Sequence, residues 1–289
     1  MLPLAHKPGF RILRCPVCRR ELNPIGQSLV CEHGHNFDLA RSGYVNLTVG
    51  RGSRAAAGGD GGAQLRRRSA FLASGHFDFI ADAILRRART VRARSSSRLR
   101  ILDAGCGTGY HLGRIARDRP GIHAPAEGLG LDISKQAARI GARHFKELAF
   151  AVTDLWADWP IRSGSVDLLV NVFAPKNFRE AARVLAPDGL LAVVYPGEEH
   201  LVELRHEFDL MGMREGKAHS YLEVLRRFFG EIQHARFQRP SVLDPEDVIN
   251  AIGMGPNATR MPEKPVAPSG TRTVTFDVEF LFARLPLPA

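Results

Sequence analysis

The chain of 289 residues lacks the long apolar runs of a membrane protein. Its most apolar stretches, 166–175 and 190–196, are as long as a strand and fall short of the roughly 20 residues that a helix needs to cross a bilayer. The N-terminal residues contain neither the apolar core of a signal peptide nor a small-residue cleavage site. We therefore expect a cytoplasmic protein with no membrane partner.

Cysteine is also scarce, because four residues are too few for a disulfide scaffold of this size. Three of them stand in the pattern Cys15-x2-Cys18-x12-Cys31-x3-His35. Three thiolates and one imidazole complete the tetrahedral shell of Zn²⁺ and leave no position for water, which predicts one structural zinc ion per chain. His33 competes with His35, although a single residue between it and Cys31 is a cramped spacing. The alternative is a set of unrelated reduced thiols.

Charge is distributed unevenly along the chain. Lys and Arg total 40 and Asp and Glu total 30, a net charge of +10. Residues 41–100 hold 13 arginines, no lysine and three acids, so 13 − 3 = +10 lies in this stretch and the remainder is close to neutral. A concentrated arginine field is typical of proteins that bind phosphates or other polyanions. The alternative is that these arginines are solvated surface residues without a binding role.

The composition, 44% hydrophobic and 24% charged, is that of a globular protein. We divide the chain into an N-terminal module (1–47), a Gly- and Arg-rich linker (48–63) and a larger domain (64–289). Apolar residues at helical spacing predict helices over 64–90, with a break at Gly75. From 99 to 196 strands alternate with helices, which predicts an α/β fold with a doubly wound, mostly parallel sheet.

Particular elements follow from local patterns. The predicted strands of this region are 99–104, 126–131, one that ends at Asp154, 166–173 and 190–195, the last after a turn at 187–189. Asp244, followed by proline and two acids, predicts a helix start. Alternation of apolar and polar residues over 273–282 predicts a strand with one buried face.

A glycine-rich loop follows the first of these strands. Asp103 ends the strand, and Gly105, Gly107 and Gly109 follow in a G-x-G-x-G spacing. These glycines permit a sharp turn and let a ligand approach the backbone closely. Dinucleotide-binding enzymes use the different spacing G-x-G-x-x-G.

Two further acids end the next strands. Asp132 ends the second strand and can accept hydrogen bonds from both hydroxyls of a ribose. Asp154 ends the third strand, where it could meet an adenine amino group. Together with the loop, these acids favour S-adenosylmethionine as cofactor, and a nicotinamide dinucleotide is the alternative.

Residues 99–196 resemble the class I S-adenosylmethionine-dependent methyltransferases. The zinc motif and further segments extend the resemblance over nearly the whole chain, to the 23S ribosomal RNA guanine-N1-methyltransferase family. Within that family the sequence of residues 171–175, Asn-Val-Phe-Ala-Pro, most resembles the Gram-positive branch that confers resistance to tylosin-type macrolides. The further matching segments are 37–47, Gly59-Asp60, Arg67-Arg68 with Phe71-Leu72 and Gly75-His76, Pro196 with His200-Leu201, and Met254-Gly-Pro256.

The resemblance implies methyl transfer from S-adenosylmethionine to N1 of a guanine in a hairpin loop of 23S rRNA, in helix 35 near the peptide exit tunnel. It implies zinc on the Cys15, Cys18, Cys31 and His35 set and 23S rRNA as the partner. We consider a homodimer as well as a monomer. Family members often carry tyrosine at the position of Phe77, so only a stacking contact is expected there. The cofactor contacts that it implies come from Phe77, from the loop with Thr108 and Tyr110, from Asp132 and from His200.

We expect the acceptor pocket at the carboxyl ends of the first and fourth strands. Its rim would include Asn171, Phe173, Ala174 and Pro175, with Phe173 as a stacking face for the base. The alternatives are that Phe173 is a core aromatic residue and that Asn171 only caps its strand. The candidates for a general base that removes the N1 proton are Asp154, His111 and His200, and the alternative is that the proton leaves through water.

Two other functions compete with this interpretation. A small-molecule methyltransferase of an antibiotic pathway would share residues 99–196 but would not need the zinc module or the arginine field. A non-catalytic zinc-dependent RNA-binding protein would have a damaged cofactor loop, whereas Asp103, the three glycines and Asp132 are intact. If RNA is the substrate, we expect neutralisation of Arg66, Arg67 and Arg68 to weaken RNA binding and leave cofactor affinity intact.

Overall fold

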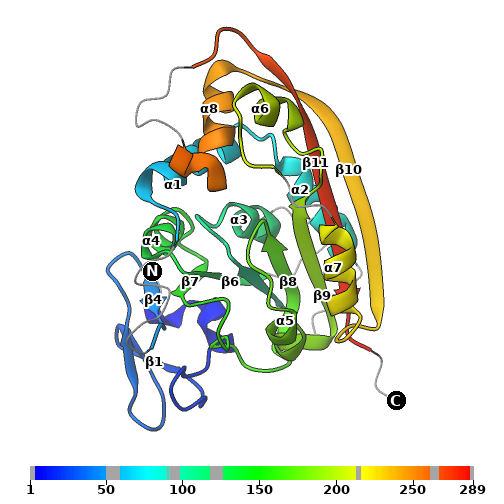
Figure 1. The fold of residues 1–289 in the computed structure, drawn as a ribbon. Helices are drawn as coiled ribbons and strands as arrows, with labels where there is room; N and C mark the ends of the chain where they lie inside the picture. The colour runs from blue at the N-terminus through cyan, green and yellow to red at the C-terminus, as the bar shows by residue number, and fades with distance from the viewer. Residues whose placement is uncertain are drawn as a thin grey trace.

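The computed structural model describes residues 4–49, 59–89, 91, 98–117, 126–212, 216–260 and 267–286. A sheet of eight strands forms its centre (Figure 1). In spatial order the strands are β10 (Glu231–Leu243), β11 (Arg272–Arg284), β9 (Leu185–Pro196), β8 (Val166–Val172), β5 (Leu99–Ala104), β6 (Ala126–Asp132), β7 (Ala149–Val152) and β4 (Tyr44–Asn46).

The sheet is mostly parallel. Strands β4 to β9 pair in parallel, whereas β11 runs antiparallel to both β9 and β10. From β5 the chain proceeds through β6 and β7 in one direction and then returns to β8 and β9 on the other side. The carboxyl ends of β5 and β8 therefore form a topological switch point, which is where open α/β sheets bind ligands. The predicted doubly wound architecture is confirmed.

Helices cover both faces of this sheet. One face packs against a core that includes Phe71, Ile80 and Val248, and the other against a core that includes Phe10 and Val184. On the first face lie α1 (Gly62–Ala73), α2 (Asp78–Ala88), α3 (Tyr110–Arg117), α4 (Lys135–His144), α6 (Val202–Glu207) and α8 (Pro245–Gly253). On the second lie α5 (Phe178–Val184), α7 (Lys217–Leu225) and the 3₁₀ helix η2 (Pro8–Ile12).

The N-terminal module builds a small antiparallel sheet of its own. Its strands are β1 (Asn23–Ile25), β2 (Ser28–Val30) and β3 (Asn36–Asp38). The module then continues directly into the large sheet, because β4 pairs with β7. Most of the predicted linker, residues 50–58, lies outside the described residues. No helix within the described ranges is long and apolar enough to cross a membrane.

Several local predictions are confirmed. Gly75, with φ of +78°, separates α1 from α2. The Asp244 side chain accepts a hydrogen bond from Asp247 N at 2.8 Å and so begins α8.

The predicted turn at 187–189 lies in a bulge of β9 instead of before the strand. Strand β9 already begins at Leu185, which pairs with Val166. A register shift follows before Leu168 pairs with Leu190, so the Pro-Asp-Gly residues lie within the irregular start of the strand.

The prediction of one buried face for the last strand is wrong. All residues of β11 from Phe276 to Ala283 are buried, because the strand lies between two others with a core on each side. Its polar residues are paired: Asp277 binds Arg236 of β10, and Glu279 contacts His234. Alternation here reflects buried carboxylates with side-chain partners on β10 rather than exposure to solvent.

Candidate metal centre and cofactor site

The four predicted zinc ligands meet in the N-terminal module. One ligand atom from each of Cys15, Cys18, Cys31 and His35 lies within 4.8 Å of the others. The Sγ atoms of Cys18 and Cys31 are 3.5 Å apart, and Cys31 Sγ lies 3.3 Å from His35 Nδ1. The competing residue His33 is exposed and faces Glu32 instead. Three soft thiolates and one imidazole at this separation fit a tetrahedral Zn²⁺ with bonds of about 2.0–2.3 Å.

Two tight turns bring these ligands together. In the first, Cys15 O accepts a hydrogen bond from Arg19 N at 2.9 Å, with Arg19 in the left-handed region at φ +64°. In the second, Cys31 O accepts from Gly34 N at 2.9 Å, and Gly34 has φ of +77°. The module needs both turns to aim its donors at one point.

Backbone hydrogen bonds dock this module onto the connection between β7 and β8. Arg14 N donates to Pro160 O and Arg162 N donates to Ile12 O, both at 2.9 Å. Two ion pairs reinforce the contact: Arg19 to Asp158 at 2.7 Å and Arg162 to Glu21 at 2.6 Å.

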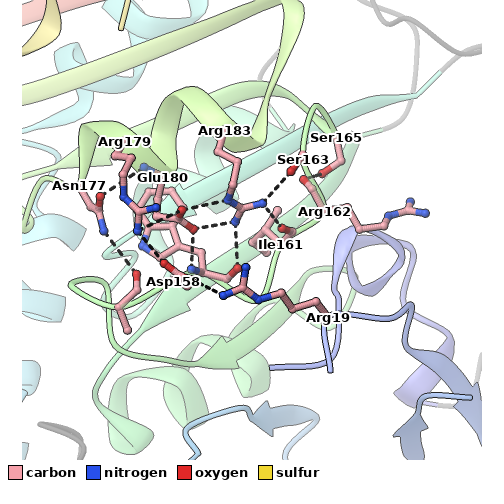
Figure 2. A network of polar contacts seen from close by, with 12 residues as sticks. Arg19, Asp158, Ile161, Arg162, Ser163, Ser165, Asn177, Arg179, Glu180 and Arg183 are labelled. Atoms are coloured by element: carbon pink, nitrogen blue, oxygen red, sulfur yellow. Dashed lines mark hydrogen bonds and ion pairs between the residues drawn. The ribbon is translucent and has the colours of Figure 1, made fainter. Parts of the chain in front are cut away.

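Behind this contact lies a network of polar side chains (Figure 2). The buried carboxylate of Glu180 accepts hydrogen bonds from Arg183 and from Trp159 N, each at 2.7 Å. Burial alone would raise the pKa of Glu180, but these donors outweigh it and lower the pKa. Arg179 pairs with Asp158 at 2.6 Å and so joins the network to the ion pair made by Arg19. The zinc module is thereby held on a rigid base.

The glycine-rich loop folds against the ends of β6 and β8. Gly105 N and Cys106 N both donate to Leu131 O, at 2.8 and 3.0 Å. Gly105 has φ of +90°, and a Cβ on it would lie 2.2 Å from the Cβ of Ala174. Glycine is required here because the loop and the 171–175 segment touch.

Asp132 has the geometry of a ribose acceptor. Its Oδ2 accepts from Gly107 N and its Oδ1 from Ser134 N, both at 2.8 Å. Each carboxylate oxygen has a further acceptor site, so two remain for the adjacent hydroxyls of a ribose. The residues therefore fit the predicted cofactor.

Arg68 lies at this edge rather than on a free surface. It pairs with Asp60 and donates to Met254 O at 2.7 Å. Its Nη1 is 3.5 Å from the position that a Cβ of Gly107 would take. The grouping of Arg68 with arginines that face RNA is therefore corrected, because its guanidinium is already engaged beside the cofactor loop.

The two remaining acids at the strand ends differ in character. Asp103 is 2% exposed, and burial together with the nearby Asp132 charge raises its pKa to about 8. Asp154 follows β7, and its Oδ1 accepts from Trp156 N at 2.9 Å. Thr153 N donates to Asp132 O at 2.9 Å, so Asp154 lies one residue from a direct contact with Asp132. Their roles toward the cofactor stay predictions.

Three predicted site residues from distant parts of the chain form one aromatic cluster. The ring centroid of Phe77 lies 5.6 Å from that of Phe173 and 6.0 Å from that of His200, and Phe173 and His200 are 6.0 Å apart. Phe276 of β11 packs against Phe77 at 5.1 Å. Phe77 is buried, whereas Phe173 is 39% exposed with φ of +51°. The alternative that Phe173 is a core residue is therefore wrong.

The histidine candidates for a general base are both held neutral. The Nδ1 atom of His200 accepts a hydrogen bond from Asp277 N at 3.3 Å, which places the proton on Nε2. Burial lowers the pKa of His200 to about 4, and it lowers the pKa of His111 to about 4 as well. In this tautomer His200 has no free nitrogen to accept the N1 proton.

Asn171 and Tyr110 are tied to neighbouring residues. Asn171 Nδ2 donates to Ala104 O at 2.8 Å and to Pro175 O at 2.9 Å, so it caps its strand and joins β8 to β5. This contact fixes the rim that carries Pro175. The Tyr110 hydroxyl donates to Asp78, and burial and this contact raise its pKa.

Sequence reasoning missed the residues that support His200. The buried carboxylate of Asp277 binds Arg236 through two hydrogen bonds of 2.7 and 2.6 Å and also accepts from Glu199 N at 2.9 Å. No local pattern marks these residues, because a polar residue in an alternating strand resembles a solvent-facing one. Phe276, which packs against Phe77, is identified from the sequence only as part of the apolar pattern of the 273–282 strand.

Family models match both parts of the chain. One described as "RlmA, N-terminal", a zinc ribbon, matches residues 13–48, and one described as "Methyltransferase domain" matches residues 101–189. The YcgJ protein of Bacillus subtilis has a similar fold, with a TM-score of 0.50 and 15% identity over 73% of this chain and all of that one. The class I methyltransferase fold and the expectation of zinc and S-adenosylmethionine as cofactors are confirmed.

Similar sequences extend over almost the entire chain. The 23S rRNA (guanine(748)-N(1))-methyltransferase of Streptomyces fradiae is 36% identical over 98% of this chain and 100% of its own length. A protein of Micromonospora griseorubida named for guanine-N1 methylation of 23S rRNA is 39% identical over 85% of this chain and 86% of its own length. The chain belongs to the family of 23S rRNA guanine-N1-methyltransferases.

Proposed function

We propose that this enzyme transfers a methyl group from S-adenosylmethionine to N1 of a guanine in 23S rRNA. The observation that carries the proposal is the arrangement at the switch point of the sheet. There the glycine-rich loop and Asp132 meet a rim with an exposed aromatic ring, Phe173. The zinc module is docked on the connection between β7 and β8. Its relatives are named for this reaction.

The cofactor supplies the methyl group as an electrophile, and the protein supplies its position. We assign the ribose to Asp132, the backbone contacts to the 105–110 loop, and apolar contacts to Phe77 and His200. Phe173 is the residue of the cluster that is most open to solvent, so it is the stacking face for an extruded guanine. Holding the two reactants in line contributes a large share of catalysis, about 7–11 kcal/mol in ideal cases.

The N1 proton must also leave. His200 has no free nitrogen in the tautomer that its hydrogen bond from Asp277 N implies, and His111 is buried within the first turn of α3. Asp154 lies at the end of β7, on the side where we place the adenine. We therefore propose that the proton leaves to water at the rim.

The finer parts of this proposal concern the substrate and the assembly. We place the guanine in a hairpin loop of helix 35, near the peptide exit tunnel, with resistance to tylosin-type macrolides as the outcome in the cytoplasm.

We also propose a homodimer. It is supported by β10, whose side chains are exposed over most of its length and whose outer edge has no partner strand in the described chain. Analytical ultracentrifugation tests the dimer; a single monomer species at all concentrations would contradict it.

Acceptor competition tests the reaction class. Purified enzyme receives labelled S-adenosylmethionine with unmodified 23S rRNA, transfer RNA and a macrolide in separate reactions. We expect label in 23S rRNA alone. Label only in the macrolide would contradict the proposal and favour a small-molecule methyltransferase, whereas cofactor binding without label in any acceptor would favour a non-catalytic RNA-binding protein.

A matched pair of variants tests the site. Asp132→Asn removes the charged acceptor, so we expect the affinity for S-adenosylmethionine to fall by roughly 100-fold, which corresponds to about 3 kcal/mol. Phe173→Ala should leave that affinity within about twofold and raise the KM for RNA instead. Isothermal titration with S-adenosylhomocysteine and steady-state kinetics separate the two effects.

A further inference from the structure

A basic groove lies between the N-terminal module and helix α4. Its volume is about 480 Å³. The turn at 40–44 forms one wall, and Arg139, Arg143 and Lys146 form the other. In the fold, α4 runs above β4 at the end of the large sheet, on the side of the zinc module (Figure 1).

The wall that contains Arg41 has a fixed shape. Ala40 N donates to Tyr44 O at 2.9 Å, and Gly43 N donates back to Ala40 O at 2.7 Å. Gly43 has φ of +91°, a conformation that favours glycine. Tyr44 then enters β4 and pairs with Phe150 of β7, which anchors the turn on the sheet.

The opposite wall is equally well defined. Arg139 and Arg143 are four residues apart on α4, so their side chains lie on the same side of the helix. Ser134 caps this helix by accepting a hydrogen bond from Ala137 N at 3.3 Å. Both arginines and Lys146 are exposed.

The four cations of this groove, Arg41, Arg139, Arg143 and Lys146, have no acidic partner within the described part of the chain. The acid next to Lys146 in the sequence, Glu147, is engaged by Arg117 at 2.9 Å. Several exposed arginines elsewhere do have such partners, as Arg179 has in Asp158. Like charges gathered in one concavity repel one another, and a bound anion relieves that repulsion.

We infer that this groove binds backbone phosphates of the RNA substrate, at a place separate from the methyl-transfer pocket. The inference deepens the proposed function and rests on it. Two rigid walls with cations on both sides suit a strand with repeated phosphates, and the ring of Tyr44 in the lining offers a surface for a base or sugar. The groove therefore orients the RNA while the pocket selects the guanine.

The test compares two double variants that remove the same charge. Arg139→Gln/Arg143→Gln removes both arginine charges from one wall of the groove. Arg272→Gln/Arg284→Gln removes two arginines of β11, at the far end of the sheet from the groove, that are paired with Glu207 and Glu231. Filter binding measures the affinity of each for unmodified 23S rRNA over a series of potassium chloride concentrations.

For the groove variant we expect affinity to fall roughly tenfold and the salt slope to decrease by about 1.5, because each lost phosphate contact contributes about 0.7–0.9 to the slope. The KM for RNA should rise, while kcat at saturating RNA and the affinity for S-adenosylhomocysteine stay unchanged. The control variant should retain the wild-type slope.

An unchanged slope in the groove variant, or equal losses in both variants, would overturn the inference. Failure of the wild type to methylate 23S rRNA that it binds is a different result, because it would contradict the proposed function through the activity measurement alone. If the wild type does not bind 23S rRNA, both proposals fail.

Discussion

Two arginine-rich regions of this molecule have opposite electrostatic surroundings. Under the zinc module, Arg19, Arg179 and Arg183 each bind a carboxylate at 2.6–2.7 Å (Figure 2). In the groove beside α4, Arg139 and Arg143 have no carboxylate partner among the residues that the structure describes. The first region uses its arginines to hold two parts of the chain together. The second leaves them available to an external anion.

The difference shows that arginine content alone does not locate a nucleic-acid surface. The sequence suggested that residues 41–100 would bind a polyanion because they hold a charge equal to the whole net charge of the chain. In the structure, however, Arg68 and Arg100 of that stretch pair with Asp60 and Asp167. Arg139 and Arg143 lie outside the stretch. What matters is the position of the acids, which depends on tertiary contacts.

Loss of the zinc site should have the largest effect on this comparison, because the module carries Arg19 of one region and Arg41 of the other. Cys15→Ser removes a buried ligand, and structural zinc contributes about 10 kcal/mol or more to the folding of such modules. We expect zinc content to fall from one per chain to near zero and RNA affinity to be lost. Elemental analysis checks this result. Cys106 is a buried cysteine outside the cluster, so the Cys106→Ser variant should retain one zinc ion per chain.

Disruption of the polar network behind the zinc module should destabilise the protein less than loss of the zinc site does. Glu180→Gln removes the charge that faces Arg183 and leaves a largely buried guanidinium without its counter-ion. We expect about 3 kcal/mol of destabilisation, measured by urea unfolding. A loss below 0.5 kcal/mol would show that the pair is dispensable and would weaken the contrast between the two regions.

His200, which is kept neutral by burial beside the ion pair of Arg236 and Asp277, extends the comparison to pH. The folded state keeps His200 neutral with a pKa of about 4, whereas the unfolded chain takes up a proton near its ordinary value of 6.5. The contribution of the neutral His200 to the free energy of unfolding is therefore present above pH 6.5 and is lost as pH falls toward 4. At pH 5 the loss is about 2 kcal/mol. His200→Asn keeps a hydrogen-bond acceptor and should reduce that loss in thermal melts. An equal loss in the variant would contradict this assignment.

The smallest effect on stability is expected in the groove. Arg139→Gln/Arg143→Gln removes no ion pair within the described chain, so the free energy of unfolding should change by less than about 0.5 kcal/mol. Urea unfolding beside the Glu180 variant gives a direct contrast. A loss similar to that of Glu180→Gln would show that these arginines stabilise the fold.

The sequence allowed prediction of those parts of the fold and site that depend on short-range patterns. The metal ligands and the G-x-G-x-G loop are defined by spacing over few residues, and the structure brings Cys15, Cys18, Cys31 and His35 together. Strand β10 was not predicted because most of its side chains are exposed on both faces, so it has no apolar alternation.

The support of the site by β11 was missed for a related reason. Asp277 resembles a solvent-facing residue until Arg236 of β10 is placed opposite it. The aromatic cluster joins Phe77, Phe173 and His200 through contacts between distant segments. Only the family resemblance linked two of these residues to the cofactor, and no local pattern did so.

The central claim is that the methyl group goes to N1 of one guanine in 23S rRNA. Reverse transcription of 23S rRNA after incubation with the enzyme and S-adenosylmethionine tests it most directly, because an N1-methyl group blocks the pairing edge of guanine. We expect one new stop, in a hairpin loop, which disappears when S-adenosylmethionine is omitted. Labelled RNA without any stop, or stops spread over many positions, would contradict it.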